Sequence, residues 1–398
     1  MKYLLRSLAA GASLCAVAVL QLPVTASAGV LTADMVSART YLKTTLDYQD
    51  PMYLPSEAQK NGTVMLRTPI VDGPYAGYNS YCSGTVVGYR TIVTAAHCVS
   101  GLDPRDDEYG DYGTPQVRFG GYNGTQVSVA SIDIHPLYYD ATYGKFAQGA
   151  FAAGDIAVLH LSETIPAGTK IYKLFNGDAS GEVATHISYG TTGNGDGSNG
   201  DIFSLDNLAN GRIGKNLYEG SLADLFGPDY LTGAQLVYDF DTGDAANNAL
   251  PWWASPYGYL LPDGSIYIDP LTDIYQDLGL GDEEVLIDGG DSGGGAFVNG
   301  KLAGVHSFGF TLGGEYCDGV LNPNPNDPFD TSGAFNPEII NNPDIDCALN
   351  STFGEVAGDT AVAFYYDWLM ARIPEPATYG LMGLGALMAA FGLRRRRA

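Results

Sequence analysis

Short runs of apolar and β-branched residues, each closed by Gly, Pro, Asn or Asp, recur along most of this chain. Runs of four to seven residues have the length of strands, and the residues between them suit tight turns. No heptad pattern and no internal repeat accompanies them. We therefore expect an all-β fold built from antiparallel strands. The expected strands are residues 63–66, 84–87, 91–95, 126–132, 156–161, 183–188, 236–240 and 302–307.

Composition and charge narrow the class of protein further. Gly supplies 52 and Tyr 27 of the 398 residues, which favours turns and strands and argues against a coiled coil. Apolar residues make up 45%, so the chain can bury a core and is not intrinsically disordered. The 45 acidic and 20 basic residues give a net charge of −25. Such a surface repels nucleic acid, and no nucleic-acid partner is expected.

The N-terminus is typical of a secretory signal peptide, which we place at residues 1–28. Lys2 and Arg6 precede an apolar run at 8–20, and small residues at 26–28 supply a cleavage pattern. Signal peptidase would therefore act on the chain, and the mature protein would be exported.

Three features organise the rest of the chain. The segment 29–62 receives no assigned role; residues 33–46 could form a short helix, and the segment could be a propeptide or the first edge of a barrel. The main domain is expected over residues 63–373, where apolar side chains at spacings of three and four predict a helix at 360–373. Long loops are expected where Gly, Pro and Asp are frequent. These loops are residues 189–200, 247–281 and 313–353.

The C-terminal segment, residues 374–398, begins Pro-Glu-Pro, continues with 17 mostly apolar residues and ends with Arg394–Arg397 before the last alanine. This order resembles the PEP-CTERM sorting tail of Gram-negative bacteria that make exopolysaccharide. The apolar stretch barely crosses a bilayer, and the arginines would hold its end in the cytoplasm. The resemblance implies a transient transmembrane segment in the inner membrane, cleavage by an exosortase, and release to the cell surface or extracellular matrix. An ordinary C-terminal anchor helix remains the alternative.

Four cysteines remain once Cys15 leaves with the signal peptide. An even number in an exported protein predicts two disulfides, of which three pairings are conceivable. Sequence proximity favours Cys82 with Cys98. The second pair would then be Cys317 with Cys347. None of them has a CxxC spacing, and no metal site is predicted.

Three motifs carry the chemistry of the chain. His97 lies in the run 94–98 after an expected strand, Asp155 opens another strand, and Ser292 lies in the glycine-lined loop 290–294. In this order the motifs resemble the chymotrypsin-like (trypsin-type) serine peptidases, over residues from about 64 to 373. The resemblance implies two packed antiparallel six-stranded β-barrels with a C-terminal α-helix. The catalytic groups would lie between the barrels, and protein or peptide substrates would be cleaved there.

The resemblance also implies a role for each residue. His97 would take the proton of the Ser292 hydroxyl, and Asp155 would orient His97 and stabilise its charged form. The amides of Gly290 and Ser292 would form the oxyanion hole. Ser307 would donate a hydrogen bond to Asp155.

Cleavage preference depends on the pocket for the residue before the scissile bond, whose base falls on Leu286. A leucine there removes the carboxylate that Arg or Lys requires, unless Asp359 or Glu355 reaches in. Cleavage after apolar residues is therefore expected. Cleavage after Glu is the alternative, because glutamyl endopeptidases of this superfamily place a histidine at the position of His306. The pocket wall would comprise His306, Ser307, Phe308 and Gly309.

The chain departs from the family pattern at several positions. Gly295 stands where proline is usual, and Asp288 stands where many relatives have a disulfide cysteine. No Ile-Val-Gly-Gly sequence precedes the main domain. Activation by a freed terminus inserted beside Asp291 is therefore not expected.

No cofactor is expected. Residues 194–199 superficially suggest a calcium loop but lack its glycine and glutamate. The carboxylates Asp239 and Asp241, or Asp327 and Asp330, leave calcium binding open. Histidines other than His97 and His306, such as His186, are expected to be packing or surface residues. A different function is the alternative: a catalytically silent relative could bind the extracellular matrix through the aromatic residues of the stretch 252–259.

Overall fold

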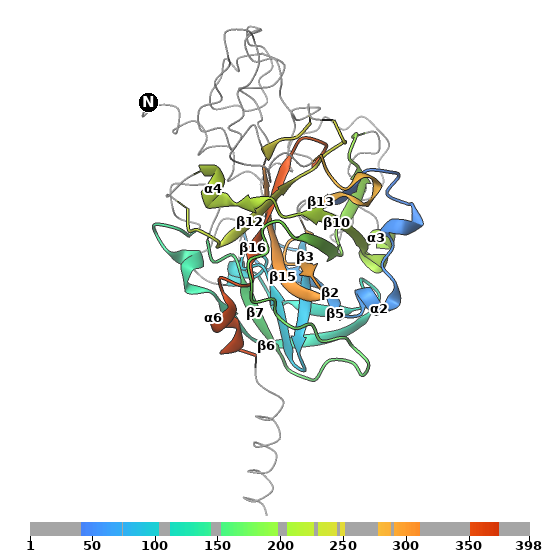
Figure 1. Ribbon diagram of the computed structural model, residues 1–398. Helices are drawn as coiled ribbons and strands as arrows, with labels where there is room; N and C mark the ends of the chain where they lie inside the picture. The colour runs from blue at the N-terminus through green and yellow to red at the C-terminus, as the bar shows by residue number, and fades with distance from the viewer. Residues whose placement is uncertain are drawn as a thin grey trace, which may run out of the picture.

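The protein is described here by a computed structural model, in which strands dominate and helices are short (Figure 1). The predicted all-β class with a C-terminal helix is confirmed, and each of the eight predicted strands coincides with an observed one. The structure describes residues 41–73, 75–102, 112–144, 153–197, 205–226, 230–244, 247–250, 278–287, 290–310 and 351–373.

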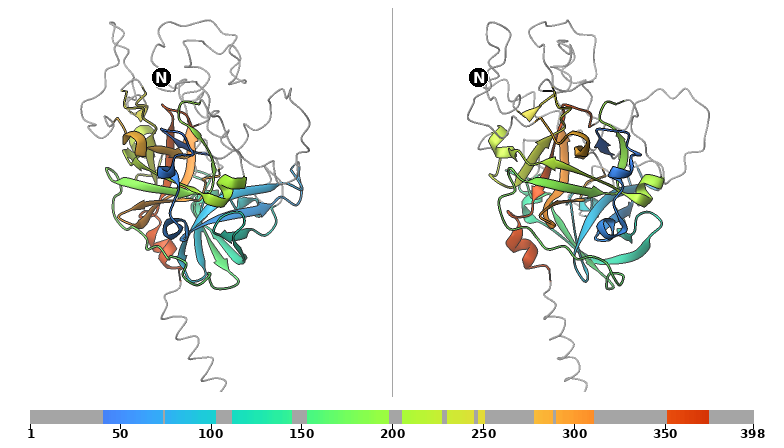
Figure 2. Two further views of the ribbon diagram at one scale, coloured as in Figure 1. Left: turned by 90° about the vertical axis from the view of Figure 1, so that its right-hand side faces the viewer. Right: turned by 45° about the vertical axis from the view of Figure 1, so that its right-hand side comes forward.

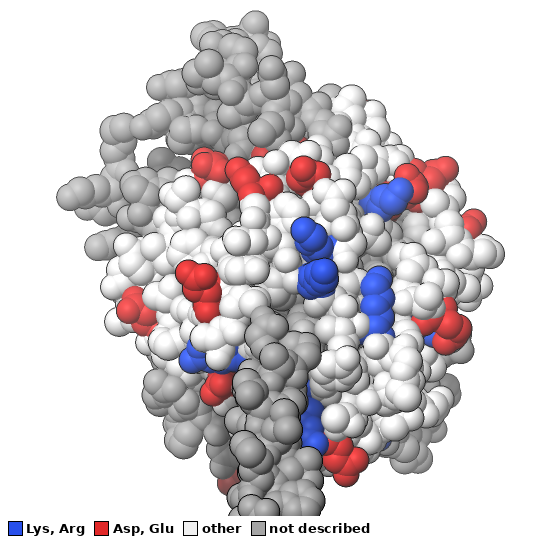
Figure 3. All heavy atoms as spheres, turned by 60° about the horizontal axis from the view of Figure 1, so that its bottom comes forward, with Lys and Arg blue, Asp and Glu red and all other residues white. Residues whose placement is uncertain are grey.

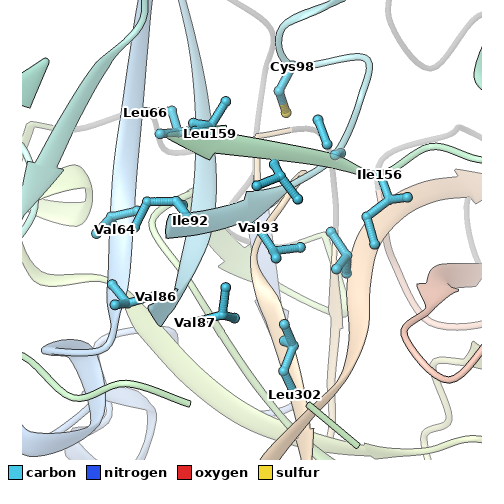
Figure 4. Packing of buried hydrophobic residues seen from close by; sticks show 14 of the residues in the cluster. Val64, Leu66, Val86, Val87, Ile92, Val93, Cys98, Ile156, Leu159 and Leu302 are labelled. Atoms are coloured by element: carbon cyan, nitrogen blue, oxygen red, sulfur yellow. The ribbon is translucent and has the colours of Figure 1, made fainter. Parts of the chain in front are cut away.

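Six antiparallel strands close into a barrel in the order β2-β3-β4-β7-β6-β5. Val64, Ile92 and Leu159 come from three of these strands and lie together in its interior (Figure 4). Branched aliphatic side chains fit the pleated inner surface, which explains why these runs form strands. The barrel strands are β2 (Thr63–Pro69), β3 (Asn79–Gly88), β4 (Thr91–Thr94), β5 (Gln116–Phe119), β6 (Thr125–Ile134) and β7 (Ala157–Leu161).

The second half of the chain forms an antiparallel sheet of seven strands in the order β10-β8-β14-β15-β16-β12-β11. A second closed six-stranded barrel was predicted; among the described strands the sheet stays open, because β11 is two residues long and runs directly into α4. Figure 2 shows the two halves packed together, and Leu302 of β15 joins the barrel core. The strands are β8 (Val183–Ser188), β10 (Arg212–Leu217), β11 (Gly220–Ser221), β12 (Gln235–Asp239), β14 (Gly295–Val298), β15 (Lys301–Phe310) and β16 (Val356–Ala361).

A third, small sheet brings the N-terminal segment into the fold. Its central strand β1 (Tyr41–Thr44) is antiparallel to β13 (Val285–Ile287) and parallel to β9 (Thr191–Asn194). The helix predicted for 33–46 is therefore wrong over β1, because strand pairing on both sides overrides the local pattern. The loop predicted for 189–200 likewise contains a strand, β9.

The helices are short and peripheral. The helix predicted over 360–373 is shorter than predicted, because β16 extends to Ala361 by pairing with β12 and β15, and α6 begins only at Tyr366. No helix in the described ranges is long and apolar enough to cross a membrane. The predicted tail, residues 374–398, lies outside those ranges. The helices are η2 (Pro51–Tyr53), α2 (Glu57–Lys60), η3 (Ser100–Leu102), η4 (Pro136–Tyr139), α3 (Leu205–Asn210), α4 (Leu222–Phe226), η6 (Gly281–Glu283) and α6 (Tyr366–Met370).

Candidate active site

His97 and Asp155 meet because two barrel strands are paired. Thr94, the last residue of β4, lies opposite Ala157, the first residue of β7, so the chain just after β4 faces the chain just before β7. The Nδ1 atom of His97 lies 2.7 Å from Oδ2 of Asp155, and the His97 backbone amide donates to Oδ1 at 2.9 Å. The carboxylate therefore fixes both the ring and the backbone of His97.

The second half of the molecule completes the environment of Asp155. Ser307 of β15 donates to Oδ2 of Asp155 at 2.5 Å, and Thr360 of β16 donates to its backbone oxygen at 2.9 Å. Burial raises the pKa of Asp155, but the charge of His97 and the hydrogen bonds from His97 and Ser307 lower it more, so the pKa lies below its ordinary value. An ionised Asp155 favours the proton on Nδ1 of His97, so Nε2 is the unprotonated nitrogen that can act as a base.

The loop that carries Ser292 is pressed against the barrel. The Ser83 amide of β3 donates to the Ser292 backbone oxygen at 2.8 Å. Gly293 has a φ of 78°, and a Cβ there would lie 2.1 Å from Oγ1 of Thr94 and 2.4 Å from the Ser83 backbone oxygen. Gly290 also has a φ of 78°. Only glycine fits this close approach, and the glycines allow Ser292 to project at the junction of the two halves.

Cys98 lies between His97 and Ser292. Its Sγ atom is 3.8 Å from Nε2 of His97 and 3.6 Å from the Ser292 backbone oxygen. The fold thus brings together His97, Asp155 and Ser292, the three residues that the sequence motifs singled out. Ser292 is 8% exposed, so it lies at a small opening rather than on an open surface.

The residues around the oxyanion-hole candidate are held by the barrel as well. The hydroxyl of Ser83 accepts from the Tyr189 amide at 2.8 Å and lies 3.4 Å from the Gly290 carbonyl, to which it donates. Asp291 is fully buried, and its carboxylate rests on Gly190, where a Cβ would lie 2.2 Å from Oδ1. The two residues before Ser292, Gly290 and Asp291, are therefore both held in place by neighbouring chain.

A disulfide joins Cys82 of β3 to Cys98, with Cα atoms 6.1 Å apart. It ties the chain next to His97 to the barrel wall. Cys317 and Cys347, the other pair favoured by the sequence, lie outside the described residues.

We expect the double variant Cys82→Ala, Cys98→Ala to lose roughly 3 kcal/mol of unfolding free energy, because the bridge restricts a loop of this length in the unfolded chain. Urea denaturation of the variant and of the wild-type protein measures the difference. Wild-type protein incubated with reductant should move toward the variant, and an unchanged midpoint in both cases would contradict the expected contribution.

The predicted pocket residues fall on β13 and β15. Leu286 is 1% exposed on β13, which packs against β15 and β16. The pairing of β15 with β16 shifts between His306 and Phe308, and Ser307 at this irregularity points to Asp155. The Phe308 ring covers Gly358, where a Cβ would lie 2.3 Å from its Cζ. Gly309, half-buried, follows on the same strand.

His306 turns away from Asp155 into a buried polar network. Its Nδ1 lies 3.0 Å from Oδ1 of Asp359, and both residues are fully buried. Tyr238 donates to the same oxygen at 3.2 Å, and Tyr218 donates to the other. Burial alone would raise the pKa of Asp359, but His306 lowers it below the ordinary value. Asp359 is therefore an anion that is satisfied inside the protein.

His186 stacks on His306 with ring centres 5.1 Å apart and planes at 12°. It is fully buried, as expected for a packing residue, and burial lowers its pKa to about 3, so it is neutral at physiological pH. Glu355, the other carboxylate considered for the pocket, accepts from the Thr352 amide at 3.0 Å.

Two groups of three side chains in the described ranges have metal-ligand spacing. In the first, Cys82 and Cys98 are joined to each other as a disulfide and offer no thiolate to a metal beside His97. In the second, Nδ1 of His306 is already paired with Oδ1 of Asp359 at 3.0 Å, and its ring is stacked on that of His186. We assign a metal site to neither group.

The calcium candidate Asp239 is used by the protein backbone. Its Oδ2 accepts from the amides of Ala249 and Leu250 at 2.6 and 2.9 Å, and burial raises its pKa. Asp241 is also buried, and its amide donates to Oε1 of Glu284 at 2.7 Å. Of the candidate stretch 194–199 the structure describes 194–197; residues 198–199, Asp327 and Asp330 lie outside the described ranges. So do Asp288 and the aromatic stretch 252–259.

The sequence reasoning missed β1, and it missed Tyr218 and Tyr238 as partners of Asp359. No local motif marks any of them. Lys43 of β1 is only 1% exposed, and its neighbours Leu42 and Thr44 are also buried. The strand is therefore buried even though it contains polar and charged residues.

The trypsin family model matches residues 68–215, which include His97 and Asp155, and the PEP-CTERM protein-sorting motif matches residues 372–397. Residues 68–215 therefore resemble the trypsin family, the chain carries a PEP-CTERM sorting motif, and these matches support a serine-type endopeptidase.

Particular relatives are distant. Trypsin Tyr p 3.0101 of Tyrophagus putrescentiae is 27% identical over 279 residues, which cover 66% of this chain and 76% of that trypsin. The solved structure of neuropsin, a serine protease expressed in the limbic system of mouse brain, is 15% identical, with a TM-score of 0.44 over 80% of this chain and 97% of that one. HL collagenase is 14% identical, with a TM-score of 0.44 over 80% and 96%.

Proposed function

We propose that this protein is a secreted serine endopeptidase that hydrolyses peptide bonds through His97, Asp155 and Ser292. The arrangement of Asp155 supports this most directly: it binds the ring and the backbone of His97 while accepting from Ser307 of the other half. A carboxylate with these three bonds fixes the imidazole tautomer and stabilises the imidazolium that proton transfer creates.

The reaction proceeds through an acyl-enzyme. The Ser292 Oγ attacks the scissile carbonyl carbon while Nε2 of His97 takes the hydroxyl proton. The amides of Gly290 and Ser292 stabilise the negative oxygen of the tetrahedral intermediate. The intermediate collapses as the C–N bond breaks, and His97 gives its proton to the leaving amine. Water then repeats the sequence on the ester, so the acid leaves and Ser292 is regenerated, with no cofactor.

A fluorophosphonate probe tests the proposal and separates it from the matrix-binding alternative. The probe forms a phosphorus–oxygen bond only with a serine activated by its base and oxyanion hole. We expect stoichiometric labelling of Ser292, located by peptide mass spectrometry. An unlabelled, folded protein would instead favour the catalytically silent relative.

We further propose that the enzyme cleaves after apolar residues. Leu286 brings no charge to the pocket base, and the carboxylates of Asp359 and Glu355 are bound inside the protein rather than available to Arg or Lys. His306 faces Asp359 at 3.0 Å, so its positive form would be balanced by a neighbouring anion. That pairing weakens its attraction for a substrate carboxylate and disfavours the Glu alternative.

Chromogenic peptides that differ only in the residue before the cut test this preference. We expect kcat/KM for Leu, Phe, Met or Tyr to exceed that for Glu, Arg or Lys by about tenfold or more. Strong turnover after Glu, lost in His306→Ala with the fluorophosphonate reaction retained, would favour recognition by His306. Strong turnover after Arg or Lys would exclude both preferences.

The sorting motif indicates export and a cell-surface or extracellular location in a Gram-negative bacterium, with exosortase as the processing enzyme. We propose that the tail resides in the inner membrane until cleavage, and that the released enzyme acts among exopolysaccharide.

The face around the end of α6 carries acidic and basic side chains that are interspersed (Figure 3).

A further inference from the structure

The strand β1 fills the space between two segments that lead to the serine loop. Leu42, Lys43 and Thr44 pair with β13 on one side and with β9 on the other, and all three are buried. The blue N-terminal ribbon lies beside β13 in Figure 1. A strand paired along both edges is integral to its sheet and leaves two unpaired edges if it is removed.

Hydrogen bonds extend the attachment to β9. The Gly195 amide donates to the Thr44 backbone oxygen at 2.8 Å. The Thr44 hydroxyl donates to the Leu46 backbone oxygen at 2.7 Å and lies 3.4 Å from the Gly193 carbonyl. The Tyr48 amide donates to the side-chain oxygen of Asn194 at 3.1 Å. Tyr48, which follows β1 in the chain, thus helps to hold β9 in its pairing with β1.

A second set of bonds fastens the segment to the chain that enters β13. The Thr45 hydroxyl donates to the Gly281 backbone oxygen at 3.0 Å. The Tyr53 hydroxyl donates to the Asp282 backbone oxygen at 2.7 Å and accepts from the Leu46 amide at 3.0 Å. Tyr53 is 1% exposed and packs in the same core cluster as Leu42 and Leu286.

Both partner strands adjoin residues of the serine loop or of the pocket base. β13 carries Leu286, and Gly290 follows three residues after its end at Ile287. β9 follows immediately after Gly190, on which the carboxylate of Asp291 rests. A displacement of β13 or β9 would therefore reach the pocket base and the residue before Ser292.

We propose that residues 41–54, the N-terminal strap, position the pocket base and the serine loop for catalysis. This inference rests on the proposed function. The strap acts while residues before Tyr41 are still attached to it. The enzyme therefore becomes active when it folds and needs no freed N-terminus. The segment that the sequence left without a role is then a positioning element rather than a removable propeptide.

Extending the N-terminus tests the first part of the proposal. A full chain with an uncleavable peptide tag inserted after the signal peptide, before Gly29, should match the untagged chain in kcat per fluorophosphonate-titrated serine. N-terminal sequencing of the active protein should find residues 41–54 still attached. Activity that appears only after a cut within or beyond the strap would overturn the proposal.

Conservative variants test positioning by the strap. Tyr53→Phe keeps the buried ring and loses the hydroxyl, and Thr44→Val keeps the shape and loses the donor. We expect kcat per titrated serine to fall roughly tenfold in Tyr53→Phe, because a small misplacement of reacting groups is costly. The acidic limb of the pH profile should stay unchanged, since His97 and Asp155 are held by other bonds. Met52→Ala, 41% exposed in the same segment, is the matched control.

The readouts separate positioning from stability. A merely structural role would lower the titrated fraction of serine and leave kcat per titrated site at the wild-type value. That result would overturn the proposal. So would a kcat per titrated serine in Tyr53→Phe and Thr44→Val equal to that of Met52→Ala. Failure of the proposed function looks different, because the wild-type chain itself would neither react with the fluorophosphonate nor cleave peptides.

Discussion

Ser292→Ala is expected to abolish peptide hydrolysis, and His97→Ala is expected to do the same, each with a loss of roughly a millionfold in kcat. The two losses are similar because the hydroxyl and the imidazole act in one proton transfer, and neither works without the other. Turnover of a peptide with the preferred residue before the cut measures the loss, and circular dichroism checks the fold. The residual rate should stay above that in water because of the oxyanion hole.

The chain offers a matched control for these variants. His160 and Asp133 form a second imidazole–carboxylate pair at 3.1 Å, and Ser162 is exposed nearby in sequence. His160→Ala and Ser162→Ala should keep nearly full activity, because this pair lies on the barrel strands away from the serine loop. Near wild-type turnover in Ser292→Ala or His97→Ala would remove the catalytic assignment.

Asp359→Ala is expected to lower the unfolding free energy by about 3–5 kcal/mol, the cost of removing one partner from a buried ionic network. His306, Tyr218 and Tyr238 all direct a polar hydrogen at this carboxylate, and the alanine leaves these groups buried without it. Urea denaturation at pH 7 measures the change.

The pH dependence identifies the carboxylate as the source of that stability. The folded pKa of Asp359 lies below its ordinary value of 3.8, so its contribution is complete above that pH and disappears as pH falls through the folded pKa. The difference in unfolding free energy between the wild type and Asp359→Ala should therefore be constant from pH 5 to 7 and become smaller at lower pH. Asp367→Ala, on the exposed surface of α6, should change stability little at any pH.

The residues of the candidate site could be picked out of the sequence because their signals are local and ordered. His97 and Ser292 lie in short motifs of small residues, and the glycines at 290 and 293 are needed for the backbone angles observed there. Five of the six barrel strands were equally readable, since their branched apolar residues face one core, whereas β5 was not predicted. Such local patterns predict an element even when its tertiary contacts are unknown.

The remainder depends on partners that are distant in the chain. The strand β1 shows no strand signal of its own and is extended because β9 and β13 flank it. No sequence pattern around Asp359 indicates that two tyrosines more than a hundred residues earlier donate hydrogen bonds to it. Among the described strands the sheet of the second half is open, and β11 at its edge is only two residues long.

The contact of Gly293 with Ser83 and Thr94 also bears on how such a protein can change during evolution. The barrel supplies Ser83 and Thr94, the other half supplies Gly293, and there is no room for a Cβ between them. A half exchanged with that of a relative would have to bring a compatible surface at these three positions. The two halves are therefore inherited as one unit, and recombination within this family should preserve the trio even where the loops around it diverge.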